Sequence, residues 1–116
     1  MIAASITKTI SIEASSEKVF DYLADARNWP EWAIVNVKSI EDDDGEWFKM
    51  ETPFGEGKLR IRANEEFGIL DHDFDSPEAS WTVPARVVKN GEGAEFVITF
   101  YKPPAFTDEF FQQHLL

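Results

Sequence analysis

The chain has 116 residues, of which 43% are hydrophobic, with 22 acidic and 11 basic side chains, a formal net charge of −11 and no cysteine. This length predicts a single domain over residues 1–116, and the hydrophobic share excludes a disordered chain despite the charge. The acidic excess argues against nucleic acid as a partner, the lack of cysteine excludes disulfides, and no apolar run reaches the ~20 residues of a membrane span, so we expect a cytoplasmic protein.

The first expected elements are a strand over residues 6–13 and a helix over residues 16–26. Alternation of apolar and polar side chains predicts the strand, with Lys8 as the charged residue of its inward face. Ser15 or Ser16 offers an N-cap hydroxyl for the helix, whose apolar residues recur at helical spacing. A short second helix is expected to start at Pro30.

The rest of the chain carries the pattern of an antiparallel meander that ends in one more helix. Gly-, Asp- and Asn-rich turn signals punctuate it at 42–45, 54–57, 65–68, 76–78 and 90–93. Pro103 and Pro104 end the last strand, and Thr107 is placed to cap the final helix. The order is therefore strand, two helices, six strands, helix, with the six strands at about 35–41, 46–53, 57–65, 69–75, 79–89 and 94–102.

One hairpin can be aligned residue by residue. A four-residue loop at 65–68 puts three basic residues opposite three aspartates on one face and leaves the other face apolar except for His72. A slip of one residue would turn every side chain to the wrong face, so the register is well specified. The predicted pairs are Arg62–Asp71, Arg60–Asp73, Lys58–Asp75, Ala63–Leu70, Ile61–His72 and Leu59–Phe74.

The whole chain resembles a known superfamily. Its opening SITKTISIEASSEKVFDYLAD (residues 5–25), Trp29-Pro30-Glu31-Trp32, VPARVV (residues 83–88) and the segment 96–111 are similar to the START/polyketide-cyclase-like (SRPBCC, helix-grip) superfamily, in particular its bacterial polyketide cyclase/dehydrase-like members. The resemblance implies an α+β helix-grip fold, in which a curved antiparallel sheet of about seven strands surrounds a C-terminal helix, here short. It also implies a hydrophobic cavity between sheet and helix. Members of the superfamily transport lipids, bind hormones or quinones, or cyclise polyketides.

Several residues have both a structural and a functional interpretation. His72 lies on an inward strand face, where it could act as an acid/base, hydrogen-bond a ligand, or simply bond to backbone inside a core. Lys8 could bind an anionic ligand group or extend to solvent. Trp29, Trp32 and Trp81 could stack on a flat ligand or fill the core.

No motif predicts a metal site, a cofactor or a catalytic constellation. The run Asp71-His72-Asp73-Phe74-Asp75 begins like a calcium loop but lacks the glycine and the terminal glutamate, so an ion-paired sheet face is the better interpretation. Two histidines that lie far apart in sequence make a weak case for zinc.

The main prediction is a START-like domain that binds a small hydrophobic or aromatic ligand. Two alternatives stay open: a polyketide cyclase/dehydratase-like enzyme with His72 as acid/base, and a protein-interaction module. A homodimer through the short C-terminal helix is also expected. The candidate ligand-binding residues are Lys8, Trp29, Trp32, Phe48 or Trp47, Met50, Leu59, Ile61, His72, Phe74, Trp81, Phe96, Ile98, Phe100, Phe110 and Phe111.

Overall fold

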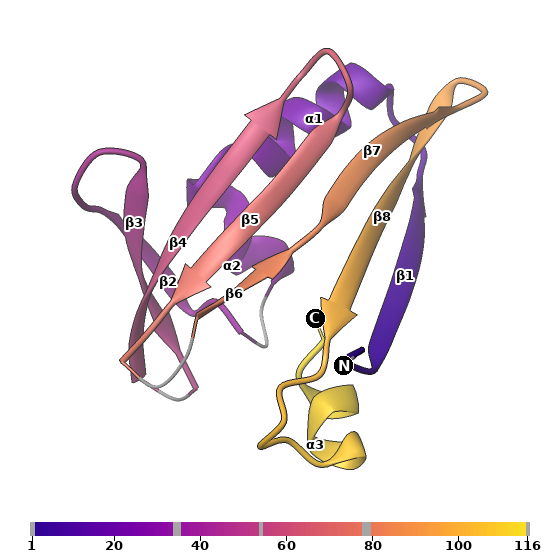
Figure 1. Cartoon of the computed structure of the whole chain (residues 1–116). Helices are drawn as coiled ribbons and strands as arrows, with labels where there is room; N and C mark the ends of the chain where they lie inside the picture. The colour runs from indigo at the N-terminus through magenta and orange to yellow at the C-terminus, as the bar shows by residue number, and fades with distance from the viewer. Residues whose placement is uncertain (1, 34–35, 54, 78–79, 116) are drawn as a thin grey trace.

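A single curved sheet of antiparallel strands, with helices on one side, forms the described part of the chain in the computed structural model, which covers residues 2–33, 36–53, 55–77 and 80–115 (Figure 1). The strand order is β1-β8-β7-β5-β4-β3-β2, and β6 pairs with β5. The elements are β1 (Ser5–Ile12), α1 (Ser16–Ala24), the 3-10 turn η1 (Ala26–Asn28), α2 (Trp29–Trp32), β2 (Ser39–Asp42), β3 (Trp47–Thr52), β4 (Gly55–Asn64), β5 (Ile69–Asp75), β6 (Ser80–Val83), β7 (Ala85–Asn90), β8 (Gly93–Tyr101) and α3 (Asp108–Gln113).

This architecture confirms the predicted α+β helix-grip fold with a short C-terminal helix. Ser15 caps α1 by accepting a hydrogen bond from the backbone N–H of Lys18, and Thr107 caps α3 in the same way through the N–H of Phe110. Val35 and Ala79, the expected first residues of two strands, lie outside the described residues, as do Phe54 and Glu78 of two predicted turns. No described helix is long and apolar enough to cross a membrane.

The register of the β4–β5 hairpin is confirmed at all six predicted pairs. The side-chain charges, however, are distributed differently from the simple pairing of opposite residues. Both Arg60 and Arg62 donate to Asp73, with nitrogen–oxygen distances of 2.8 Å and 3.0 Å. The ammonium group of Lys58 lies 3.2 Å from Asp43. Arg60 therefore pairs with its own partner in the register, whereas Arg62 and Lys58 reach past theirs to less exposed carboxylates.

The prediction of one strand over residues 79–89 is wrong, because Pro84 divides this segment into β6 and β7. Proline has no N–H to give to a neighbouring strand, so a sheet ladder is interrupted where it stands. On one side of Pro84, β6 pairs with β5, and on the other side β7 pairs with β8. The sheet therefore parts between β6 and the C-terminal half of β8, which Figure 1 shows as a widening gap between these two strands.

At the other end of the gap between β6 and β8, the sheet is continuous because β5 and β7 come together. Their only ladder pair among the described residues is Ile69 with Arg86, and the N–H of Val87 donates to the carbonyl of Gly68 at 2.8 Å. A little further along, the carboxylate of Asp71 accepts the N–H of Ala85 at 3.0 Å. This side chain takes the place of a missing backbone acceptor where the two strands begin to separate.

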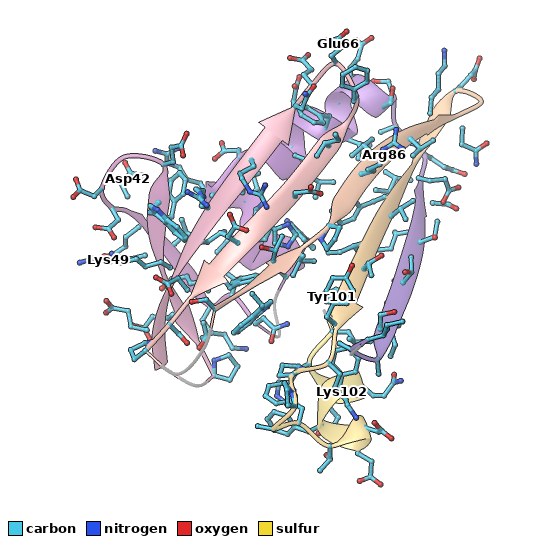
Figure 2. All side chains as sticks on the ribbon, in the orientation of Figure 1. Asp42, Lys49, Glu66, Arg86, Tyr101 and Lys102 are labelled. Atoms are coloured by element: carbon cyan, nitrogen blue, oxygen red, sulfur yellow. The ribbon has the colours of Figure 1, made fainter. Side chains whose placement is uncertain are left out.

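Two hydrophobic clusters fill most of the concave face. In the first, Val19, Phe20 and Leu23 of α1 pack against β7 and β8. In the second, residues of η1 and α2 pack against β3 and β4, with Trp29 at its centre. The short helix α3 lies beyond the ends of β1 and β8 (Figure 1). Charged side chains such as Lys49 and Glu66 project away from the ribbon (Figure 2).

Candidate ligand-binding cavity

A cavity of about 130 Å³ lies where α2, the ends of several strands and the C-terminal segment meet. An apolar cavity of this size is comparable with ones that admit a single aromatic ring. Most of its wall is apolar, and eight of the residues predicted from the sequence to bind a ligand line it, together with the predicted lid residue Phe111. These eight are Trp29, Trp32, Met50, His72, Phe74, Trp81, Ile98 and Phe100.

The other predicted residues lie elsewhere among the described part of the chain. Leu59 and Phe96 are buried in the two hydrophobic clusters, and Ile61 packs against both. Lys8 is exposed on edge strand β1, opposite Ile98 in register. Phe110 packs edge-on against Phe106 at a centroid distance of 4.7 Å. Strand parity placed Leu59 and Phe96 on covered faces, but it also put the exposed Lys8 on an inward face. It could not tell which part of the concave face α1 and Trp32 would already cover. Phe48 packs against the second cluster and Trp47 stacks under Arg60.

His72 is the most buried polar residue of the cavity wall, with 2% of its surface exposed. Its Nδ1 lies 2.9 Å from the carbonyl oxygen of Leu70. A carbonyl oxygen can only accept, so Nδ1 carries the hydrogen and Nε2 carries a lone pair. Burial lowers the pKa of His72 to about 4. The hydrogen bond to Leu70 and the charges of Asp71 and Asp73 raise this pKa, but their effect is smaller than that of burial.

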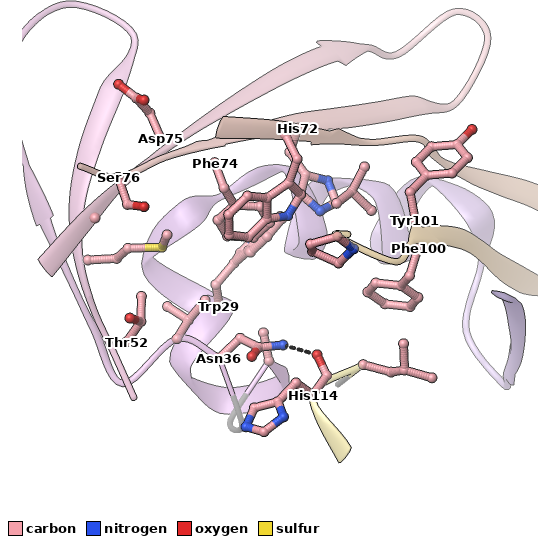
Figure 3. Close-up of a pocket in the computed structure, with 18 of the residues that line it drawn as sticks. Trp29, Asn36, Thr52, His72, Phe74, Asp75, Ser76, Phe100, Tyr101 and His114 are labelled. Atoms are coloured by element: carbon pink, nitrogen blue, oxygen red, sulfur yellow. Dashed lines mark hydrogen bonds between the residues drawn. The ribbon is translucent and has the colours of Figure 1, made fainter. Parts of the chain in front are cut away.

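Aromatic rings surround His72. Trp29 lies with its ring nearly perpendicular to the imidazole at a centroid distance of 4.6 Å, and Phe74 does the same at 5.5 Å. Trp29 itself is held by a hydrogen bond from its indole N–H to the carbonyl of Leu23 at 2.8 Å. Figure 3 shows His72 and Phe74 at one side of the cavity and His114 at the other.

The C-terminal segment contributes residues that sequence reasoning missed. Asn36 donates from Nδ2 to the carbonyl of His114 at 2.7 Å, which ties the tail to the segment after α2 (Figure 3). Phe106, His114 and Leu115 line the cavity, and Leu115 is only 2% exposed. The segment that holds Asn36 has no periodic pattern. The C-terminal helix was expected to cover the cavity, but its sequence did not show that His114 and Leu115 would line it.

The parting of the sheet forms one side of the cavity. Trp81 and Val83 of β6 and Phe100 and Tyr101 of β8 all line it. Trp81 stacks on Phe74 at 5.4 Å and is still 42% exposed, so one of its faces meets solvent. The cavity is thus bordered by an exposed aromatic side chain on the β6 side of the gap.

No lysine or arginine is among the described residues that line the cavity. Glu56 and Asp75 border it, and the carboxylate of Asp75 points away from the centre, accepting a hydrogen bond from the hydroxyl of Ser80 (Figure 3). Across the described chain, no three His, Asp or Glu side chains gather closely enough to hold a metal ion. The described lining therefore holds no lysine or arginine charge, and two acidic side chains stand at its border.

The family described as "Polyketide cyclase / dehydrase and lipid transport" matches residues 3–114. No curated protein matches the chain.

Solved structures share the fold at low sequence identity. An uncharacterised protein from Bacillus thuringiensis superposes with a TM-score of 0.70 at 17% identity, covering 91% of this chain and 83% of its own. A START superfamily protein from Mycobacterium smegmatis gives 0.68 at 13% identity, covering 94% and 85%. The Zhui aromatase/cyclase from Streptomyces sp. R1128 gives 0.71 at 12% identity, covering 93% and 73%. These similarities concern the fold alone.

Proposed function

Because this chain belongs to the polyketide cyclase/dehydrase and lipid transport family, we propose that it binds a small apolar or aromatic molecule in the cavity between its sheet and its C-terminal segment. The observation that carries the proposal is a cavity walled by Trp29, Phe74 and Trp81, with the buried imidazole of His72 in its wall. Ligand pockets characteristically combine such an apolar lining with very few polar groups.

The expected affinity follows from the area that a ligand of this size buries. One aromatic ring removes ~150–250 Å² of apolar surface from water, which stabilises the complex by roughly 4–6 kcal/mol before the costs of association. We therefore expect dissociation constants in the high micromolar to millimolar range for one-ring compounds.

Native mass spectrometry of the purified protein tests whether a small molecule accompanies it. Titration with one-ring aromatic compounds, followed by backbone amide NMR, then tests saturable binding at the cavity. If no compound co-purifies and no titration perturbs the amides of the lining residues, the proposal is wrong.

Trp81→Ala should weaken binding of a one-ring aromatic about fivefold to tenfold, because it removes an aromatic wall that is not needed to fill the core. Phe67→Ala is the matched control, since Phe67 is also an exposed aromatic (58%) but does not line the cavity. Dissociation constants from the same NMR titration compare the two variants. Equal weakening by both, or by neither, would contradict the assignment of Trp81 to the binding wall.

A cyclase/dehydratase-like enzyme is the second candidate, favoured by the presence of His72 in the cavity wall. A pKa of about 4 keeps its imidazole deprotonated at neutral pH, so His72 is suited to accept a proton rather than to donate one. Incubation with a synthetic polyketide, followed by mass spectrometry, tests turnover. Loss of turnover in His72→Ala with binding retained supports an enzymatic function. Absence of turnover in the native protein contradicts it.

A homodimer, a protein-interaction role and a cytoplasmic location stay predictions from the sequence. In the structure Phe111 and Leu115 are 7% and 2% exposed within one chain, so these apolar residues of the C-terminal segment are already covered. Sedimentation velocity over a hundredfold range of protein concentration distinguishes a monomer from a dimer.

A further inference from the structure

We propose that the cavity selects an aromatic molecule with a hydroxyl group, which donates a hydrogen bond to Nε2 of His72, and that it rejects molecules of the same size that carry a carboxylate. This inference rests on the proposed binding function and names the chemical class of the ligand. It is carried by the hydrogen-bonding state of His72 and by the charges around the cavity.

The backbone fixes which nitrogen of His72 is an acceptor. Nδ1 lies 2.9 Å from the carbonyl oxygen of Leu70 and must carry the hydrogen, so Nε2 presents a lone pair. None of the described residues hydrogen-bonds to Nε2. His72 is 2% exposed and lines the cavity, so the group that completes its hydrogen bonding must come from within the cavity.

The imidazole stays neutral under ordinary conditions. Trp29 and Phe74 pack edge-on against it, and the nearest charges are already engaged: Asp73 accepts from Arg60 and Arg62, and Asp71 from the N–H of Ala85. Burial lowers the pKa of His72 to about 4, so Nε2 is not protonated at pH 7. A ligand that carries only hydrogen-bond acceptors therefore faces the lone pair of Nε2 and forms no hydrogen bond with it.

The charges around the cavity disfavour anions. The described lining contains no lysine or arginine to pair with a carboxylate, and Glu56 and Asp75 stand at its border in a protein of net charge −11. Moving an unpaired carboxylate into such an apolar space carries a large desolvation cost. An uncharged ring with a hydroxyl avoids this cost.

Phenol, toluene and benzoate test the inference, because the three share one ring and differ in a single substituent. We expect phenol to bind at least tenfold more tightly than toluene. We expect the dissociation constant of benzoate to be at least 10-fold larger than that of phenol. Dissociation constants come from backbone amide NMR titrations at pH 7. In His72→Phe the preference for phenol over toluene should fall to about onefold.

A second measurement needs no variant. The ¹⁵N resonance of His72 Nε2 in the native protein should shift upfield when phenol binds, as an acceptor nitrogen does on gaining a hydrogen bond, and should not shift with toluene. Equal binding of phenol and toluene to the native protein, tighter binding of benzoate, or an unmoved Nε2 resonance would overturn the inference while leaving the binding function intact. Failure of all three compounds to bind would instead overturn the proposed function itself.

Discussion

The buried imidazole of His72 couples the stability of the fold to pH. Its pKa is about 6.5 in an unfolded chain and about 4 in the native protein, mainly because burial disfavours the charged form. Between these values the unfolded chain binds more protons, so the free energy of unfolding decreases as pH falls from 6.5 to 4. The full effect is about 3 kcal/mol.

Urea unfolding at half-unit pH intervals measures this effect. The His72→Gln variant provides the reference, because it retains the carboxylates that also titrate in acid but lacks the imidazole. The difference between the two curves should open between pH 6.5 and 4 and should be flat below pH 4. Parallel curves throughout would show that His72 is protonated equally in both states.

Asp73 is the second residue whose environment sets its charge. Burial alone raises its pKa, but hydrogen bonds from Thr82, Arg62 and Arg60 outweigh burial and lower the pKa to about 2. Asp73→Asn removes the negative charge shared by two guanidinium groups and should cost roughly 1–3 kcal/mol, with the smaller values at high salt because both arginines are partly exposed.

Asp75→Asn is the matched control for Asp73→Asn. Asp75 lies on the same face of β5, is exposed and bonds to the hydroxyl of Ser80, so its substitution should change stability by less than about 0.5 kcal/mol. Chemical denaturation of both variants at low and high salt measures the difference. Similar losses for both would mean that the arginine pair around Asp73 contributes nothing specific.

At the scale of elements, Gly68 holds β5 against β7. Its φ angle of +68° is in the left-handed region, and a Cβ at this position would lie 2.3 Å from the carbonyl oxygen of Val87. Gly91 has a similar φ of +57° but open space around the Cβ position. Gly91→Ala should therefore lower the free energy of unfolding by about 1 kcal/mol, because of the backbone conformation alone. Gly68→Ala should lower it by roughly 3 kcal/mol or more, since β7 must also move.

Thermal unfolding of the two glycine variants measures this difference. Amide hydrogen exchange adds a local readout, because Gly68→Ala should increase exchange at Val87, whose N–H donates to the carbonyl of Gly68. Gly91→Ala should leave that amide protected. Equal costs for the two substitutions would show that the β5–β7 contact adapts without loss.

Some of these elements could be predicted from the sequence, and others could not. Alternation and turn signals predicted the approximate positions of most strands. They also predicted the β4–β5 register, because a slip would expose one whole apolar face. They could not predict the division at Pro84, since the side chains of Val83 and Ala85 continue the inward pattern across it. They also could not show that α1 would cover Phe96, because this depends on the packing of segments far apart in sequence.

At the scale of the whole molecule, the net charge of −11 is a source of repulsion that salt should relieve. Sodium chloride at 0.2 M shortens the screening length to about 7 Å and should raise the melting temperature by a few degrees. A variant with Glu41→Gln, Asp44→Asn and Glu66→Gln, which neutralises one exposed acid of β2 and two exposed turn acids, should melt higher in low salt and gain less from salt. A melting temperature that does not depend on salt would mean that the acidic groups are already compensated.

The division of one strand at Pro84 also has a kinetic consequence. Because β6 pairs with β5 and not with β8, a molecule that passes between Trp81 and Tyr101 breaks no sheet ladder. Passage then requires only rotation of exposed side chains, which takes place in picoseconds to nanoseconds, whereas separating paired strands is far slower. The cavity should therefore fill and empty rapidly, with short residence times for any molecule that enters it.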